Sequence, residues 1–267
     1  MIRVAVVRVP RGLALSCFAL FVLFATSFAG ACGGSSSSTP AGSSGASTAG
    51  KRVDVSTAGS ISGRVLFEGT APAPALLNVS ADAKCSALDK APRDESVLVR
   101  DGGLENVFVY VKDGLSGYTF DAPPDPATLD QDGCVYLPHV LGVRVGQPLE
   151  VSNSDPATHN VHAAARVNQP FNTAQPFKGM VYTHRFSKPE VAVPFKCDVH
   201  PWMLAYVGVV EHPYFDVTRN GGRFDLEGLP PGTYTVEAWH EKYGTQTAKI
   251  TLGDKESKDL SFTFKAS

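Results

Sequence analysis

F-K-C-D-V-H-P-W-M, residues 195–203, is the stretch that indicates both the fold and the chemistry of this chain. It places a thiol (Cys197), an imidazole (His200) and a thioether (Met203) within seven residues. Sulfur and imidazole donors together suit copper better than magnesium, calcium or manganese, and two histidines with one cysteine and a weak axial methionine form a blue-copper site. The upstream stretch S-N-S-D-P-A-T-H supplies the second histidine, His159. The sequence therefore predicts one copper ion, cycling between Cu(I) and Cu(II), bound by these four residues.

Other side chains near this motif are weaker candidates for the site. His162 follows His159 by three residues, so it is expected to face away from the metal as an outer or surface residue. Met180 is a possible substitute for the axial sulfur, and Trp202 is expected to shield the metal beside Pro201. The remaining histidines are interpreted as structural: His139, His184, His212 and His240. His240 also follows Trp239 and could mark a junction between two parts of the protein.

The overall composition fits a turn-rich globular protein. The 267 residues are 43% hydrophobic, with 25 glycines and 19 prolines, which allows one or two domains. The net charge of -2 gives no indication of nucleic-acid binding. No phosphate-binding loop, dinucleotide fingerprint or nucleophile elbow is present, so an enzyme is not expected.

The N-terminus has the pattern of a secretory signal, residues 1–31. Three arginines precede the apolar run 13–28, although a short anchor helix is an alternative. A-G-A-C, ending at Cys32, resembles a bacterial lipobox, and the Gly/Ser-rich residues that follow suit a flexible tether over 32–57. We expect a lipid on Cys32 and attachment to the envelope, facing the periplasm and on the outer rather than the inner membrane. Cleavage by an ordinary signal peptidase remains the alternative.

Cysteine parity bears on the metal site. Removal of the signal and lipidation of Cys32 would leave Cys85, Cys134 and Cys197, an odd number in an oxidising compartment. If Cys197 binds copper, Cys85 and Cys134 are the natural disulfide. The alternative is that Cys197 pairs with one of them and no copper binds.

Alternating apolar patterns and turn signals predict β-strands throughout the mature chain, with no helix-length 3.6-residue period. Residues 76–90 have no clear period and are expected to form a loop or a short helical turn. Asn220-Gly221-Gly222 is typical of a tight hairpin turn. The predicted fold class is all-β.

Residues from about 132 to 212 resemble a cupredoxin of the plastocyanin and pseudoazurin class. V-R-V-G-Q-P-L-E-V-S-N-S-D-P-A-T-H-N-V is similar to the strands that lead to the first histidine ligand of that family, and the stretch 182–203 is similar to its last hairpin and ligand loop. The resemblance implies a Greek-key β-sandwich or barrel and single-electron transfer. The two residues between His200 and Met203 are fewer than plastocyanins have, so Met203 is the ligand least supported by the resemblance.

A second resemblance is to the carboxypeptidase regulatory-like, or transthyretin-like, β-sandwich. G-S-I-S-G-R-V and N-V-F-V-Y-V are similar to its early strands, and G-G-R-F-D-L-E-G-L-P-P-G-T-Y-T-V to its later ones. We predict a copper domain inserted in one sandwich, and three consecutive β modules are the alternative. The predicted division is 58–118 and 213–267 for the sandwich and 119–212 for the cupredoxin-like domain.

The leading functional hypothesis is a tethered electron carrier with an unidentified redox protein as partner. One alternative is a protein that delivers, stores or senses copper, with a copper donor or acceptor as partner. The other is a structural sandwich that mediates protein interactions. An oxidase or reductase would need a second metal centre, for which the sequence shows no second ligand cluster.

Overall fold

The structure is a computed structural model that describes residues 50–266. The predicted signal, the lipid anchor at Cys32 and most of the predicted tether lie outside these residues. Within them the chain forms eighteen strands and one helix of four residues, α1 (Ala83–Ser86), so the all-β prediction is confirmed. The described part contains no helix that is long and apolar enough to cross a membrane.

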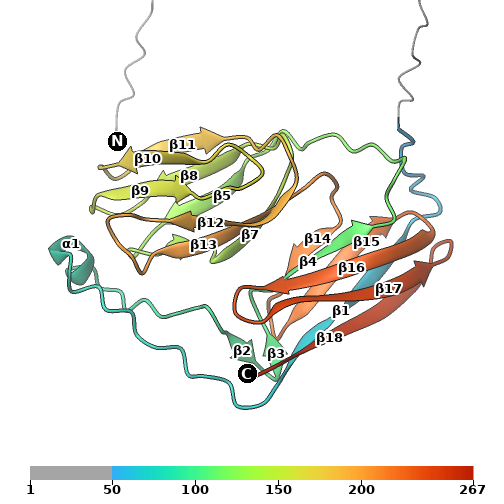
Figure 1. Cartoon of the computed structure of the whole chain (residues 1–267), viewed down its shortest axis with the longest axis horizontal. Coiled ribbons are helices and arrows are strands. Elements are labelled where there is room, and N and C mark those ends of the chain that lie inside the picture. The colour runs from blue at the N-terminus through green and yellow to red at the C-terminus, as the bar shows by residue number, and fades with distance from the viewer. Residues whose placement is uncertain (1–49, 267) are drawn as a thin grey trace, which may run out of the picture. The chain divides into compact units, whose positions relative to one another are not determined.

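One pair of sheets is built from both ends of the described chain (Figure 1). In its first sheet β1 pairs antiparallel with β15 and parallel with β18. Its second sheet has the order β14-β4-β16-β17. Alternate residues of these strands face a shared core, as Phe224 and Leu226 do on β15. The strands are β1 (Gly59–Glu68), β2 (Val99–Arg100), β3 (Gly103–Leu104), β4 (Phe108–Asp113), β14 (Phe215–Val217), β15 (Arg223–Leu229), β16 (Gly232–His240), β17 (Gly244–Leu252) and β18 (Ser257–Lys265).

The intervening residues, 127–210, form a second pair of sheets, with the orders β10-β9-β12-β13-β7 and β11-β8-β5-β6. Their shared core includes Tyr136, Phe186 and Phe195, each at most 2% exposed. The strands are β5 (Ala127–Gln131), β6 (Tyr136–Leu137), β7 (Val140–Arg144), β8 (Leu149–Asn153), β9 (His159–Ala163), β10 (Phe171–Gln175), β11 (Val181–His184), β12 (Glu190–Lys196) and β13 (Leu204–Val210).

A third apolar cluster joins the two pairs of sheets. Phe108 of β4 packs with Val140 of β7 and Val210 of β13. Gly208 is required there, because a Cβ at this position would lie 2.5 Å from the Phe108 ring. Trp239 contacts Tyr206 with ring centroids 5.0 Å apart, whereas the adjacent His240 faces the other way and stacks on Tyr243. The junction is therefore marked by Trp239 rather than by His240.

Residues 68–102, which we call the strap, connect β1 to β3, contain the two-residue strand β2 near their end, and reach the second pair of sheets around α1. Cys85 in α1 is the one buried residue of this segment, and it belongs to the same core cluster as Phe195 and Cys197. Asp82 caps α1 by accepting hydrogen bonds from the backbone amides of Lys84 and Cys85. Figure 1 shows α1 beside the ends of β12 and β13. The short helical turn expected within residues 76–90 is present.

The expected hairpin at Asn220-Gly221-Gly222 is only partly correct. All three residues have positive φ, and Arg219 and Arg223 form a bridge across the turn. The strands on either side, β14 and β15, nevertheless pair with β4 and β1 in different sheets. The buried hydroxyl of Thr218, which follows β14, donates to the carbonyl of Leu104 at this change of sheet.

Burial lowers the pKa of His240 to about 4, and this predicts a pH dependence of stability. The unfolded chain has a histidine pKa of about 6.5, so it binds more protons than the folded chain at intermediate pH. The folded state therefore loses stability as the pH falls from about 7 towards about 4, by roughly 2 kcal/mol at pH ~5 for this one group. We expect His240→Phe to remove that part of the loss when the free energy of unfolding is measured with urea at pH ~7 and at pH ~5. If the variant shows the same difference in unfolding free energy between the two pH values as the wild type, the lowered pKa does not belong to His240.

Candidate metal centre

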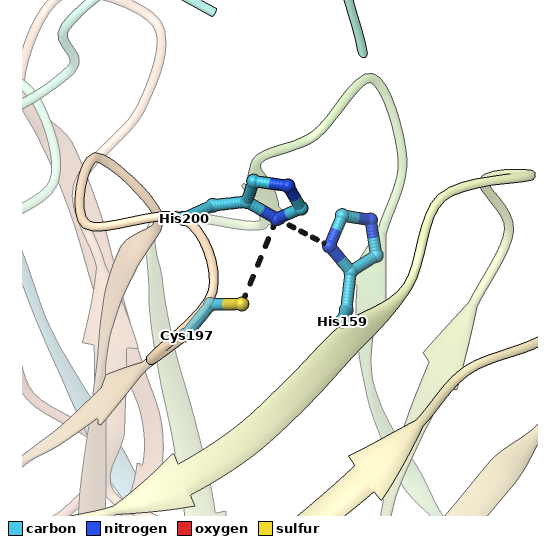
Figure 2. Close-up of side chains that lie close together, drawn as sticks. All are labelled: His159, Cys197 and His200. Atoms are coloured by element: carbon cyan, nitrogen blue, oxygen red, sulfur yellow. Dashed lines mark hydrogen bonds between the residues drawn. The ribbon is translucent and has the colours of Figure 1, made fainter. Parts of the chain in front are cut away.

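Three predicted ligands lie together in the structure (Figure 2). His159 begins β9, Cys197 follows β12, and His200 lies in the loop between β12 and β13. The two Nδ1 atoms are 2.9 Å apart, and Cys197 Sγ lies 3.7 Å from His200 Nδ1. The side chains are between 0% and 3% exposed. Two imidazole nitrogens and one sulfur thus converge on one point away from water.

The backbone closes the loop that carries two of these donors. Met203 donates its amide to the carbonyl of His200 at 2.9 Å, and its own carbonyl accepts from the amide of Cys197 at 3.4 Å. Met203 is 1% exposed and lies in the core cluster with Cys197. Its role as the axial ligand stays a prediction. Met180 is partly exposed and is not in that cluster, and its role as a substitute donor is also untested.

The hydrogen-bonded surroundings favour the thiolate form of Cys197. Burial raises the pKa of this thiol, but hydrogen bonds from His159, His200 and the backbone amide of Asn160 outweigh it, and the pKa falls to about 6. A thiolate is the form of cysteine that binds metals. The site is therefore prepared for a cation by its own hydrogen bonds.

Asp155 orients His159 and is not among the predicted site residues. Its Oδ2 lies 3.0 Å from His159 Nε2, while the amides of Gly133 and Cys134 donate to its two oxygens at 2.8 and 2.7 Å. Burial opposes ionisation of this carboxyl, yet the hydrogen bonds from His159 and the two amides keep its pKa below the usual value. A carboxylate on one ring nitrogen leaves the other free for a metal. Its position four residues before His159 was a signal that could have been used.

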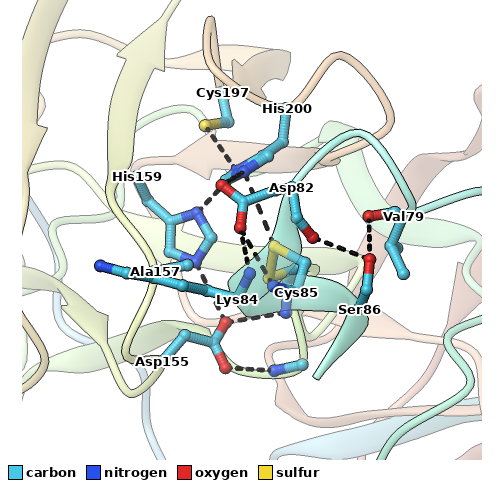
Figure 3. The surroundings of a disulfide bond; sticks show 12 residues. Val79, Asp82, Lys84, Cys85, Ser86, Asp155, Ala157, His159, Cys197 and His200 are labelled. Carbon is cyan, nitrogen blue, oxygen red and sulfur yellow. Dashed lines mark hydrogen bonds and ion pairs between the residues drawn. A yellow bond between two sulfur atoms is a disulfide. The ribbon is translucent and has the colours of Figure 1, made fainter. Parts of the chain in front are cut away.

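A second group of residues covers the outer edge of His200 (Figure 3). His200 Nε2 lies 3.3 Å from Asp82 Oδ2 and 3.6 Å from Cys85 Sγ. Cys85 and Cys134 form a disulfide, and Cys197 is the free cysteine of the described residues. The Trp202 ring lies 4.9 Å from the His200 ring, and its Nε1 donates to the Cys134 carbonyl. The strap and the disulfide thus form the outer wall of the centre.

The other histidines lie outside the convergent group. His162 points to the opposite face of β9, where its Nδ1 lies 2.9 Å from Asp198 Oδ1. His184 packs on the Phe171 ring, and His139 contacts Glu241 near the junction between the sheet pairs. Burial lowers the pKa of His212 and of His240 to about 4, which keeps both rings neutral. These contacts suit structural roles.

Comparison with known proteins gives a match to one family model and similarity to solved structures. Residues 205–265 match the family model of the carboxypeptidase regulatory-like domain. Among solved structures, the chain is similar to a purple cupredoxin from Nitrosopumilus maritimus, at 23% identity over 31% of this chain and 98% of that one, with a TM-score of 0.27. No curated protein sequence matches it significantly.

Two further solved structures have comparable likeness. A reduced mutant of amicyanin is 25% identical over 33% of this chain and 86% of its own, with a TM-score of 0.29. A copper-containing nitrite reductase from Thermus scotoductus is 18% identical over 55% of this chain but only 28% of its own, with a TM-score of 0.32.

The lowered pKa of Cys197 can be tested in the metal-free protein. We expect the ultraviolet absorbance of its thiolate to appear with a midpoint near pH 6, because His159 and His200 stabilise the anion. His159→Ala should raise that midpoint, whereas His162→Ala, on the opposite face of the strand, should not. A midpoint near the ordinary cysteine value of about 8.5 in the wild type would contradict the proposed electrostatics.

Proposed function

We propose that this protein carries single electrons through one copper ion bound by His159, Cys197 and His200, with Met203 as the weak axial donor. The observation that carries the proposal is the convergence of two Nδ1 atoms and one low-pKa sulfur in a buried position. Bound copper would exchange one electron between Cu(I) and Cu(II). The donor set of two imidazoles and one thiolate is the one that blue-copper electron-transfer sites use.

The surroundings of the donors support electron transfer because they resist rearrangement. Asp155 holds the ring of His159, and the backbone bonds of Met203 close the loop of Cys197 and His200. A site whose ligands are held from outside changes little when the charge of the ion changes, and little reorganisation suits fast electron exchange.

Trp202 offers a route from the centre to the surface. It packs against His200, is only partly buried, and lines a cavity of about 620 Å³ together with Pro201 and Glu241. We propose that a redox protein approaches on this side. The mature chain would have a net charge near -5, which favours a basic partner.

One observation favours a second candidate, copper delivery, storage or sensing without electron flow. His200 is 1% exposed and its outer edge is covered by the strap, so a partner protein cannot touch that edge directly. A reduction potential outside the range of envelope redox proteins would favour this candidate over the carrier.

We also propose a cellular location for the protein. A lipidated Cys32 and a flexible tether would hold the protein at the periplasmic face of a bacterial envelope membrane, the outer one by preference. The strand pairing supports a cupredoxin-like domain, near 119–212, inserted between two parts of a regulatory-like sandwich, near 58–118 and 213–267.

Removal of the thiolate tests the proposal. Purified wild type loaded with copper should contain one ion per chain and show an intense visible thiolate-to-copper band. Cys197→Ser should lose the band and most of the copper, because Cys197 is the one free thiol among the described residues and lies beside the two imidazoles. His162→Ala is the matched control and should keep both. A colourless copper-loaded wild type would overturn the carrier function.

The role of Asp155 gives a quantitative expectation. Asp155→Asn should lower the copper affinity by about 10- to 100-fold and keep the visible band, because the carboxylate orients His159 without binding the metal. Asp130→Asn is the matched control, since Asp130 accepts from Ser152 and Ser154 instead. Equal affinities of the Asp155 variant and the wild type would show that this carboxylate does not position the ligand.

A further inference from the structure

The two histidine rings of the metal centre each face a second set of donors through the opposite nitrogen. His200 Nε2 faces Asp82 and Cys85, and this trio lies within 4.8 Å. Cys134, Asp155 and His159 form a similar trio. One sulfur of the Cys85–Cys134 disulfide belongs to each trio, so all these donors surround one disulfide (Figure 3).

As a disulfide the two sulfurs are poor metal ligands, because the thiolate is the ligating form of cysteine. After reduction they become two adjacent thiols beside an imidazole nitrogen and two carboxylates. A pair of thiolates selects Cu(I) or zinc over hard cations. Copper is the metal that the inner centre is proposed to hold, and Cu(I) is its form under the reducing conditions that open the disulfide.

The disulfide also attaches the strap, which covers the outer edge of the metal centre. Its reduction would therefore open a way to that centre as well as supply two thiol ligands. Cys85 is the one buried residue of 68–102, and its disulfide is a covalent attachment of this segment to the core beneath it, beside the packing of Val79 and Leu88. The inner donors His159, His200 and Cys197 are at most 3% exposed. Copper therefore needs the outer wall to open before it reaches them, and so does a reductant, because Cys85 and Cys134 are themselves 2% and 0% exposed.

We propose that the reduced Cys85 and Cys134 form a second site that binds Cu(I) by both sulfurs, with His200 Nε2 as the neighbouring third donor, and that copper reaches the inner centre through it. The second site is argued from the positions of its donor atoms, whereas its role in loading copper into the inner centre rests on the proposed copper function.

The chemistry needs a dithiol reductant. One thiolate of the reductant attacks a sulfur of the Cys85–Cys134 bond and forms a mixed disulfide. Its second thiolate then displaces that sulfur, so the reductant leaves as a disulfide and both cysteines become thiols. Binding of Cu(I) releases the two thiol protons and transfers no electron.

The site is tested in the Cys197→Ser background, which lacks the inner thiolate. The protein is reduced anaerobically with a phosphine, freed of reductant and titrated with Cu(I) against a chromophoric Cu(I) chelator. We expect one tightly bound Cu(I) per reduced chain, and at least about 100-fold weaker binding when the disulfide is intact. Near-ultraviolet circular dichroism should show that the reduced chain stays folded.

Two controls test the ligands. Reduced protein whose thiols are alkylated, and Cys197→Ser combined with Cys85→Ser, should both lose the tight binding. The same titration with zinc should give weaker binding. A disulfide that resists reduction in the folded protein, a reduced chain that unfolds, no difference between reduced and oxidised protein, or a preference for zinc would overturn the proposal.

Loading of the wild type separates this inference from the proposed function. Reduction of the disulfide should speed the appearance of the visible band by at least about 10-fold. If the band forms equally fast with the disulfide intact, copper does not load through the reduced disulfide, and the proposed electron-carrier function is unaffected. If the reduced Cys197→Ser protein binds Cu(I) but the wild type never develops the band, the second Cu(I) site is supported and the electron-carrier function is contradicted.

Discussion

The metal centre depends on holding the start of β9 against the loop that follows β12. The two strands pair at Phe195 with Ala163 and at Lys196 with His162, and the amide of Ala164 just after β9 donates to the carbonyl of Pro194. The buried hydroxyl of Tyr136 strengthens this short contact, because it donates to the carbonyls of Asn160 and Lys196 on the two strands. The side-chain oxygen of Asn160 accepts from the amide of Asp198. Together these bonds fix the distance between His159 and Cys197 before any metal binds.

Local sequence patterns were sufficient for the parts of the site that are local. Cys197 and His200 lie three residues apart, and the loop that leads to His159 is recognisable from its own polar and turn residues. The alternating apolar pattern likewise predicted the all-β fold, because each strand of a sandwich buries every second side chain. The disulfide of Cys85 and Cys134 followed from cysteine parity once Cys197 was assigned to the metal.

The missed features depend on contacts between distant residues. Asp82 lies 118 positions before His200, and no spacing rule connects them. The segment 58–118 was assigned to the sandwich, and its strands do pair there, but Cys85 packs into the core beside Cys197. The turn at Asn220 is present as predicted, yet the strands on its two sides pair with β4 and β1 in different sheets, which no local pattern reveals.

The X-ray absorption spectrum of copper in the loaded wild-type protein, with its disulfide intact, tests the central claim most directly. The arrangement of His159, Cys197 and His200 predicts one short copper–sulfur bond and two imidazole nitrogens at the metal. A spectrum with only nitrogen and oxygen neighbours, or with two short sulfur bonds, would contradict it.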